Sequence, residues 1–235
     1  MKEIIKSICP PFIWKRISHL KAKRKSYLYS NRTGEDKISS PVKQDLEKYW
    51  DPEFANVLED WGKDSVWNEI QLLLANCQGK VLDIACGTGM TMKILKIFPN
   101  LDVHGFDISD LFIESAISKG IDKEKLRISD AVSTNYNNNE FDYSYSIGSL
   151  EHFTEEGIER FLHESSRYTK KSSFHMIPVS KIGKDLGWIT YVQSYFNNSA
   201  GWWYDKFIKY YSVVYIIPSK WDDDISFGRW FICVK

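Results

Sequence analysis

Short apolar runs, rich in β-branched and aromatic residues, alternate with amphipathic segments through the middle of the chain. The apolar runs predict strands, and they occupy residues 80–85, 101–107, 125–129, 141–147 and 172–179. The segments between them have helical periodicity, and they occupy residues 88–98, 109–120 and 154–169. Strands separated by helices of this length need right-handed parallel crossovers, so the pattern predicts a doubly wound α/β sheet.

The end of the chain has a different pattern. Two apolar runs, residues 210–217 and 225–234, are separated by a turn that is too short for a parallel crossover, so they should pair antiparallel. Together with the five strands before them, they predict a seven-stranded, mostly parallel sheet with a C-terminal antiparallel hairpin.

The residues before the first strand divide into three parts. Residues 11–25 have the pattern of a short basic amphipathic helix, and the polar, turn-rich residues that follow resemble a linker. Two further helices are expected over about 43–60 and 64–77. The predicted units are an arm and linker over 1–41 and a folded domain over 42–235, with an insertion at about 180–203.

The composition excludes some classes of protein. With 235 residues, 43% of them hydrophobic and 26% charged, the chain has the composition of a folded globular protein. Its 31 basic and 31 acidic side chains cancel, so it lacks the broad positive field that favours nucleic acid. Residues 1–25, however, contain eight Lys or Arg and one Glu, which gives +7 there and −7 over the rest. This arm is expected either to hold the protein near anionic lipid at the inner membrane face or to act as a surface lid.

Cysteine spacing and hydropathy bear on location and metal content. The four cysteines show no Cys or His ligand spacing, which indicates reduced thiols in a cytoplasmic protein without structural zinc. No apolar stretch approaches the ~18 residues needed to span a bilayer, and charged residues interrupt any signal-peptide core at the N-terminus. Asp222, Asp223 and Asp224 are expected to form a solvated turn, and we expect no metal.

A glycine turn joins the first strand to the first helix. There, Gly87 and Gly89 let the backbone approach a ligand closely at a helix N-terminus. Asp107 ends the second strand, where a carboxylate can accept both hydroxyls of a ribose. Met92 stands where a dinucleotide fingerprint has its third glycine, and Asp83 would repel phosphate but can bind an ammonium group. A ligand with a ribose, an adenine and an amino-acid ammonium is S-adenosylmethionine (SAM).

Four motifs, DIACGTG, GFDIS, SDA and FDYSYSIGSLEHF, follow one another in the order seen in class I SAM-dependent methyltransferases, and the chain resembles this family from about residue 64 to 235. The resemblance implies a Rossmann-like methyltransferase fold and SAM as cofactor. The cofactor contacts it implies are Asp83 near the methionine amine, Gly87 and Gly89 along the cofactor, Asp107 on the ribose, Ile108 on the adenine, Asp130 on the exocyclic amine with Ala131 beside it, and Ile147 after the fourth strand. Ala85 replaces the first glycine of the commoner motif, a change that SAM binding should tolerate.

The loop after the fourth strand should face the transferred methyl group, because ligands of such sheets bind beyond the carboxyl ends of the strands. His152 is the leading candidate for the base that takes a proton from an acceptor hydroxyl. The alternative is that His152 packs on the cofactor edge or caps the next helix. Glu151 either orients His152 or lies on the surface, and His175 is either a third catalytic residue or a hydrogen-bonded core residue.

The insertion combines aromatic rings with amides, which suits an acceptor with one apolar face and several hydroxyls. The expected substrate contacts are Trp188, Gln193, Asn197, Asn198 and Trp202. The segments YWDPEFANVLEDWG, SIGSLEHFTEEGI and SFHMIPVS resemble methyltransferases of bacterial surface-polysaccharide biosynthesis, which implies O-methylation of a sugar, a nucleotide-sugar or a glycan end.

Two alternatives stay open at this point. One is a quinone-type phenol or another small molecule as acceptor, since SLEHF resembles ubiquinone and menaquinone methyltransferases. The other is a non-catalytic SAM-binding protein. A nucleic-acid amino group is not expected as acceptor, because the Asn or Asp, Pro-Pro, aromatic pattern is absent after the fourth strand.

Overall fold

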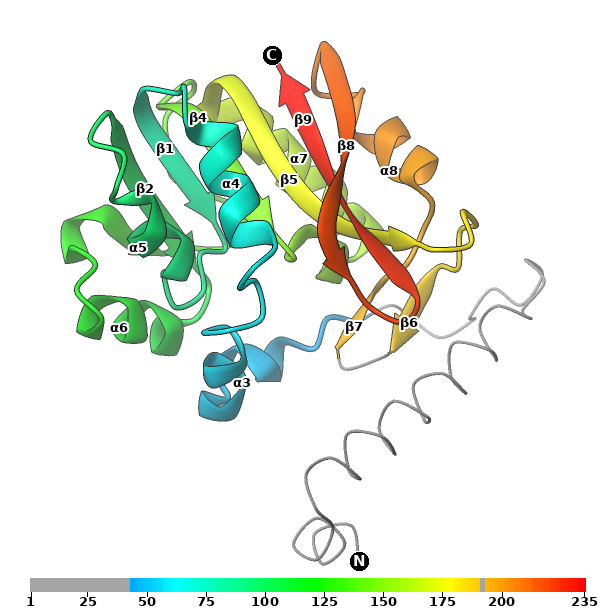
Figure 1. Cartoon of the computed structure of the whole chain (residues 1–235), viewed down its shortest axis with the longest axis horizontal. Helices are drawn as coiled ribbons and strands as arrows, with labels where there is room; N and C mark the ends of the chain where they lie inside the picture. Colours follow the sequence, from blue (N-terminus) through cyan, green and yellow to red (C-terminus); the bar gives the residue numbers. More distant parts are fainter. Residues whose placement is uncertain (1–42, 191–192) are drawn as a thin grey trace, which may run out of the picture.

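A seven-stranded, mostly parallel sheet forms the centre of the protein (Figure 1). The computed structural model describes residues 43–190 and 193–235. The strand order is β3-β2-β1-β4-β5-β9-β8, and β9 runs antiparallel to both of its neighbours. The strands are β1 (Gly79–Ile84), β2 (Leu101–Asp107), β3 (Leu126–Ile128), β4 (Phe141–Ile147), β5 (Thr169–Ser180), β8 (Val213–Asp222) and β9 (Ser226–Val234). The predicted sheet and its C-terminal antiparallel hairpin are therefore confirmed.

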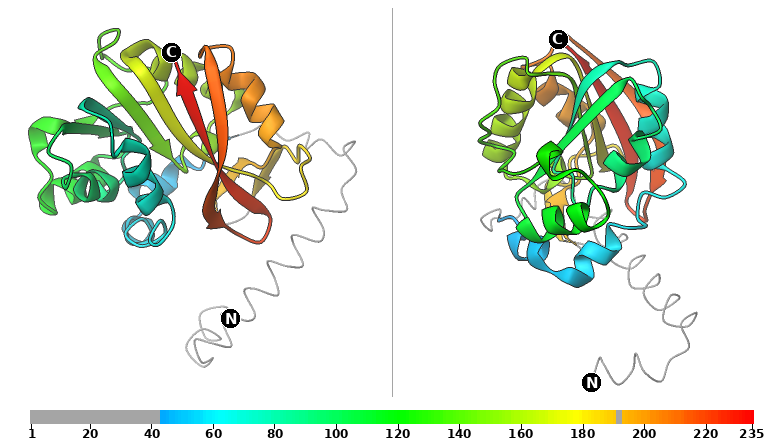
Figure 2. Two further views of the ribbon diagram at one scale, coloured as in Figure 1. Left: turned by 45° about the horizontal axis from the view of Figure 1, so that its top comes forward. Right: turned by 90° about the vertical axis from the view of Figure 1, so that its left-hand side faces the viewer.

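Helices cover both faces of this sheet (Figures 1 and 2). One face carries α4 (Val66–Leu74), α5 (Met90–Leu95) and α6 (Asp110–Ser118), and the other carries α7 (Glu155–Tyr168) and α8 (Ala200–Phe207). Successive residues of β1 serve opposite layers, because Val81 packs into the first core and Leu82 into the second. A strand buried on both faces therefore has a continuous apolar sequence instead of an alternating one.

The segment before β1 differs from the single helix expected over 43–60, and that prediction is wrong. It contains the 3-10 helix η1 (Leu46–Trp50) and the short helix α3 (Pro52–Val57). Proline disfavours helical dihedrals in the residue before it, and Asp51 is extended, with φ −95° and ψ 115°. Its side chain accepts a hydrogen bond from Glu53 N at 2.8 Å, so Asp51 caps α3 instead of continuing η1.

The insertion after β5 forms a separate antiparallel hairpin that the sequence analysis did not anticipate. Its strands are β6 (Trp188–Thr190) and β7 (Ser194–Phe196), and they pair only with each other. Two further 3-10 helices complete the described chain, η2 (Lys123–Lys125) and η3 (Leu150–His152). Figure 1 shows β6, β7 and α3 together at the end of the sheet where the parallel strands finish.

Residues 1–42 lie outside the described part of the chain, and so does the predicted basic arm. No helix among residues 43–190 and 193–235 has both the length and the apolar character needed to cross a membrane. In the same residues, no group of three His, Cys, Asp or Glu side chains is arranged to hold a metal ion.

Candidate active site

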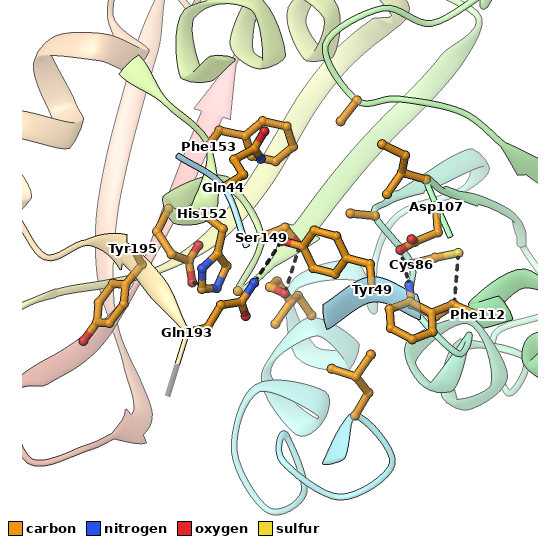
Figure 3. Close-up of a pocket in the computed structure, with 18 of the residues that line it drawn as sticks. Gln44, Tyr49, Cys86, Asp107, Phe112, Ser149, His152, Phe153, Gln193 and Tyr195 are labelled. Atoms are coloured by element: carbon orange, nitrogen blue, oxygen red, sulfur yellow. Dashed lines mark hydrogen bonds and ion pairs between the residues drawn. The ribbon is translucent and has the colours of Figure 1, made fainter. Parts of the chain in front are cut away.

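A cavity of about 640 Å³ opens at the carboxyl ends of the parallel strands, where Figure 3 shows its lining. One half is lined by the loops that follow β1, β2 and β3. The other half is lined by η3, the end of β5, the β6–β7 hairpin and the turn between β8 and β9. Residues 43–61, here called the N-terminal cover, lie across both halves and contribute Tyr49, Phe54 and Trp61 among others.

The turn after β1 depends on three residues with left-handed backbone conformations. Ala85, Gly87 and Gly89 have φ of 56°, 53° and 76°. A side chain at Gly89 would place its Cβ 3.0 Å from the Cβ of Ala116, because α6 packs directly against the turn. Gly89 therefore shapes the turn without lining the cavity, whereas Ala85 and Gly87 do line it. Alanine in place of glycine at position 85 therefore puts a residue with a β-carbon into a backbone conformation that favours glycine.

Asp107, at the end of β2, ties two loops together. Its Oδ2 accepts a hydrogen bond from Gly87 N at 2.9 Å, and its Oδ1 accepts one from Ser109 N at 3.0 Å. Burial raises the pKa of this carboxyl to about 6, although both amide bonds oppose that shift. Each oxygen keeps a further lone pair, so the carboxylate can accept the two hydroxyls of a ribose from the cavity side.

Asp83, at the end of β1, is buried beneath the same turn. Its Oδ2 accepts hydrogen bonds from Thr91 Oγ1 at 2.5 Å and from the Tyr145 hydroxyl at 2.8 Å. Burial raises its pKa to about 7, and the nearby Asp107 contributes in the same direction. A ligand ammonium group at this position would favour the ionised carboxylate and so lower that pKa.

The predicted adenine contacts, Ile108 and Asp130, line the cavity, and so do Ala131 and Ile147. Asp130 Oδ1 accepts a hydrogen bond from Val132 N at 3.1 Å, which fixes the carboxyl above the loop that follows β3. This half of the cavity therefore offers an apolar slot with a carboxylate at its edge, a carboxylate for a ribose and a carboxyl near an ammonium position, which fits SAM.

His152 lies in the other half, and its imidazole is only 15% exposed. Its Nδ1 lies 2.8 Å from the backbone carbonyl of Ser194. A carbonyl can only accept, so Nδ1 carries the proton and Nε2 holds the lone pair. Burial lowers the pKa of His152 to about 4, so the ring is neutral at physiological pH with Nε2 able to accept a proton.

Glu151, next to it, is buried and lines the cavity. Its Oε1 lies 3.7 Å from His152 Nε2, and its Oε2 has no hydrogen-bond partner among the described residues. Burial raises its pKa to about 8, so at neutral pH the carboxyl is mostly protonated. A buried polar oxygen without a partner is costly, and a ligand hydroxyl in the cavity would remove that cost.

The rest of this half has apolar and aromatic walls with a few polar groups. Trp61 from the N-terminal cover and Trp221 from the end of β8 meet edge to face, with ring centroids 6.5 Å apart. Tyr195, Gln193 and Asp223 also line the cavity. Asp223 is therefore not part of a wholly solvated turn as expected; burial raises its pKa, while backbone N–H groups of Ile225 and Ser226 bond its Oδ1 at 2.8 and 2.6 Å.

Comparison with known proteins identifies the cofactor half. Residues 81–172 match the family described as a methyltransferase domain. The protein is a SAM-dependent methyltransferase. No curated protein sequence matches the chain.

Solved structures share the fold of the methyltransferase at low sequence identity. A SAM-dependent methyltransferase from Methanosarcina mazei matches with a TM-score of 0.59 and 13% identity over 71% of this chain and 96% of that chain. Phosphoethanolamine N-methyltransferase 2 from Haemonchus contortus, in complex with phosphomonomethylethanolamine and S-adenosylhomocysteine, matches with a TM-score of 0.58 and 15% identity over 72% of this chain and 52% of that chain. The [4+2]-cyclase SpnF matches with a TM-score of 0.57 and 15% identity over 71% of this chain and 80% of that chain. Likeness at these identities shows the fold, and acceptor chemistry has to be argued from the site.

The structure does not bring every predicted residue to the cavity of the methyltransferase. His175 is fully buried between β4 and α7, where Ser146 Oγ bonds its Nδ1 at 2.8 Å, and burial lowers its pKa to about 3. It does not line the cavity and is a core residue.

Four of the five expected substrate contacts also lie elsewhere. Asn198 Oδ1 accepts a bond from Gly187 N at 2.7 Å, and the fully buried Asn197 lies within 3.5 Å of the Ile225 carbonyl. Trp188 and Trp202 pack on Phe196, with centroids 5.0 and 5.3 Å from it. These side chains hold the insertion together, and Gln193 alone of the five lines the cavity.

Sequence reasoning missed the N-terminal cover and the contribution of Trp221 and Asp223. The available signal was the density of large rings before the first strand, Tyr49, Trp50, Phe54 and Trp61, in a segment too irregular for a core helix. Trp221 and the loop after β4 both line the cavity because of the order of the strands in the sheet, and their spacing in the sequence does not reveal this.

Proposed function

We propose that the methyltransferase transfers the methyl group of SAM to a hydroxyl of a small ring-shaped acceptor, a sugar of a nucleotide-sugar or of a surface-glycan precursor. The observation that carries this proposal is the imidazole of His152, which is held neutral with its Nδ1 proton on the Ser194 carbonyl. Such a ring can accept the proton of a hydroxyl at Nε2 as that oxygen attacks.

Bound SAM supplies an electrophilic methyl group on a sulfonium. Asp107, Asp83 and Asp130 would hold its ribose, ammonium and adenine, respectively. With SAM bound, His152 Nε2 would take the acceptor proton as the acceptor oxygen bonds to the methyl carbon and the bond from that carbon to sulfur breaks, which leaves S-adenosylhomocysteine. Glu151, at 3.7 Å from that nitrogen, stabilises the imidazolium when its carboxyl is ionised. Much of the rate enhancement is expected from the alignment of the two substrates.

A sugar acceptor is supported by the walls of the second half. The rings of Trp61, Trp221 and Tyr195 offer flat apolar surfaces, while Gln193, Asp223 and the partnerless oxygen of Glu151 offer hydrogen bonds. A pyranose presents an apolar face and a rim of hydroxyls that suits this combination. A phenol of the quinone type is the second candidate, because Met176 and Pro178 add further apolar surface to the same walls.

The decisive assay incubates the full chain with methyl-labelled SAM and either nucleotide-sugars or short-chain quinone-type phenols, followed by mass spectrometry. A nucleotide-sugar product heavier by one CH₂ is expected. Product from the phenols alone would replace the sugar assignment, and tight SAM binding without product from any fraction of a cell lysate would favour a non-catalytic role. On the true acceptor, a His152→Ala variant with normal turnover would exclude His152 as the base.

We also propose that residues 1–41 form an appendage to the catalytic domain of residues 42–235, in a cytoplasmic protein. The charge of +7 over residues 1–25 supports contact with anionic lipid at the inner face of the membrane. Sedimentation with anionic liposomes, with and without residues 1–25, tests this, and equal pelleting of the two forms would dismiss it.

A further inference from the structure

The backbone of Ser194 in β7 is bonded from two sides by groups that are far apart in the sequence. The carboxylate of Asp45, in the N-terminal cover, accepts a hydrogen bond from Ser194 N at 2.7 Å. The carbonyl of the same residue accepts the Nδ1 proton of His152 at 2.8 Å. Ser194 is 5% exposed, so neither bond is readily exchanged for one with water.

Among the described residues, β7 has no backbone pairing with the main sheet, which it contacts through side chains: the Tyr195 hydroxyl lies 3.1 Å from Ser226 Oγ of β9, and Phe196 packs in the core. β7 pairs with β6 over three residue pairs, and this hairpin forms a sheet of its own. A charge-assisted hydrogen bond such as that from Ser194 N to a carboxylate is about twice as strong as a neutral one. Asp45 therefore anchors the backbone of Ser194, the residue whose carbonyl sets the tautomer of His152.

The N-terminal cover is tied down at both ends of η1. Next to Ser194, Gln193 Nε2 donates to the Tyr49 hydroxyl at 3.0 Å. On the cofactor side, Trp50 Nε1 donates to Asp110 Oδ1 of α6 at 2.8 Å, and the ring of Tyr49 meets Phe112 edge to face at 6.5 Å. The cover thus bridges the cofactor half and the acceptor half of the cavity.

We infer that Asp45 is a positioning residue for His152, and that closure of the N-terminal cover and orientation of the imidazole are one event. When the cover is displaced to admit a ligand, the bond from Ser194 N to Asp45 breaks and the Ser194 carbonyl loses its anchor. The imidazole can then rotate, or its proton can move from Nδ1 to Nε2. In the second case Nε2 can no longer accept the proton of the acceptor hydroxyl. The base is competent only after the cavity has closed. This inference rests on the proposed role of His152 in the reaction.

The test compares Asp45→Ala with Asp45→Asn, since the amide oxygen of asparagine can still accept from Ser194 N. Asp60→Ala is the matched control, because Asp60 lies in the same cover at an exposed position. With the true acceptor, Asp45→Ala should lower kcat by about tenfold or more, a part of the ~10²–10⁴ that a general base contributes. Its dissociation constant for SAM should stay unchanged. Asp45→Asn should recover most of kcat, and Asp60→Ala should keep it.

A second measurement needs no acceptor and separates this inference from the proposed function. Nitrogen-15 NMR of the imidazole, in the full chain with SAM bound, should show His152 protonated at Nδ1 in the natural protein and in Asp45→Asn. In Asp45→Ala it should show a mixture of tautomers. An unchanged Nδ1–H tautomer in Asp45→Ala would overturn the inference, as would equal losses of kcat in Asp45→Ala and Asp60→Ala. Normal turnover by His152→Ala would remove the base assignment and leave the NMR result to test the positioning contact alone.

Discussion

The left-handed conformation of Ala85 predicts that Ala85→Gly stabilises the methyltransferase. With φ at 56°, the β-carbon of Ala85 is crowded against its own backbone, which costs about 1–2 kcal/mol relative to glycine. Glycine loses about 0.5–1 kcal/mol more conformational entropy on folding than alanine, so the net gain should be about 0.5–1 kcal/mol. For a domain of this size, that gain should raise the Tm by about 1–4 °C.

Thermal unfolding followed by circular dichroism, without SAM, measures this directly. Asn139→Gly is the matched control, because Asn139 has a similar φ of 54° but asparagine tolerates that region. Its Tm should stay the same or fall slightly. The affinity of Ala85→Gly for SAM should be retained, since the turn keeps its shape. A Tm for Ala85→Gly at or below that of the natural protein would refute the strain argument.

Three further predictions follow from the buried ionisable groups. Asp107→Ala should abolish SAM binding measurable by calorimetry. Asp205→Ala, at an exposed position of α8, should leave SAM binding intact. Unchanged SAM affinity in Asp107→Ala would contradict the assignment of Asp107 to the ribose. Between pH 6.5 and 8, Asp83 and Glu151, with pKa values raised to about 7 and about 8, hold protons that the unfolded chain has released. The free energy of unfolding should therefore fall as pH rises, by up to about 1.4 kcal/mol per pH unit for each proton. His152 and His175 are neutral in the folded protein but partly protonated in the unfolded chain near pH 6.5, so they oppose this fall at the acidic end of the window. The Tm of the SAM-free protein should decline over this window, less steeply in Glu151→Gln, and a flat profile would refute the pKa assignments. His175→Leu should leave the Ser146 hydroxyl without its hydrogen-bond partner and lower the free energy of unfolding by about 1–3 kcal/mol, while the affinity for SAM stays unchanged. Weakened SAM binding without a lower Tm would contradict the assignment of His175 to the core.

The sheet could be predicted from the sequence because burial on both faces makes its parallel strands continuous apolar runs. Val81 and Leu82 show this, since neighbouring residues enter opposite cores. The helix expected over 43–60 failed because the apolar pattern continued through Pro52 while the backbone could not. The β6–β7 hairpin was missed because three-residue strands leave too short a pattern to recognise.

The two halves of the cavity were predictable to different degrees. Asp83 and Asp107 lie at the carboxyl ends of β1 and β2, and Gly87 follows β1, so the pairing of these neighbouring strands alone brings them together. Asn197 and Trp202 belong to an insertion whose side chains first have to satisfy their own buried segment. Composition identified that insertion as unusual, but it could not show which of its side chains turn inward.

The family match of residues 81–172 contains the loops after β1, β2 and β3 that line the cofactor half of the cavity and, from the acceptor half, only the loop after β4. The remaining acceptor walls come from the N-terminal cover, the end of β5, the β6–β7 hairpin and the turn after β8. Acceptor choice can therefore change during evolution while the cofactor machinery is inherited intact. Asp45 and Ser194 link the cover to the hairpin, so these two segments are expected to diversify as a pair. A chimera with a related enzyme should then transfer acceptor preference when both are exchanged together, and lose turnover when only one is replaced.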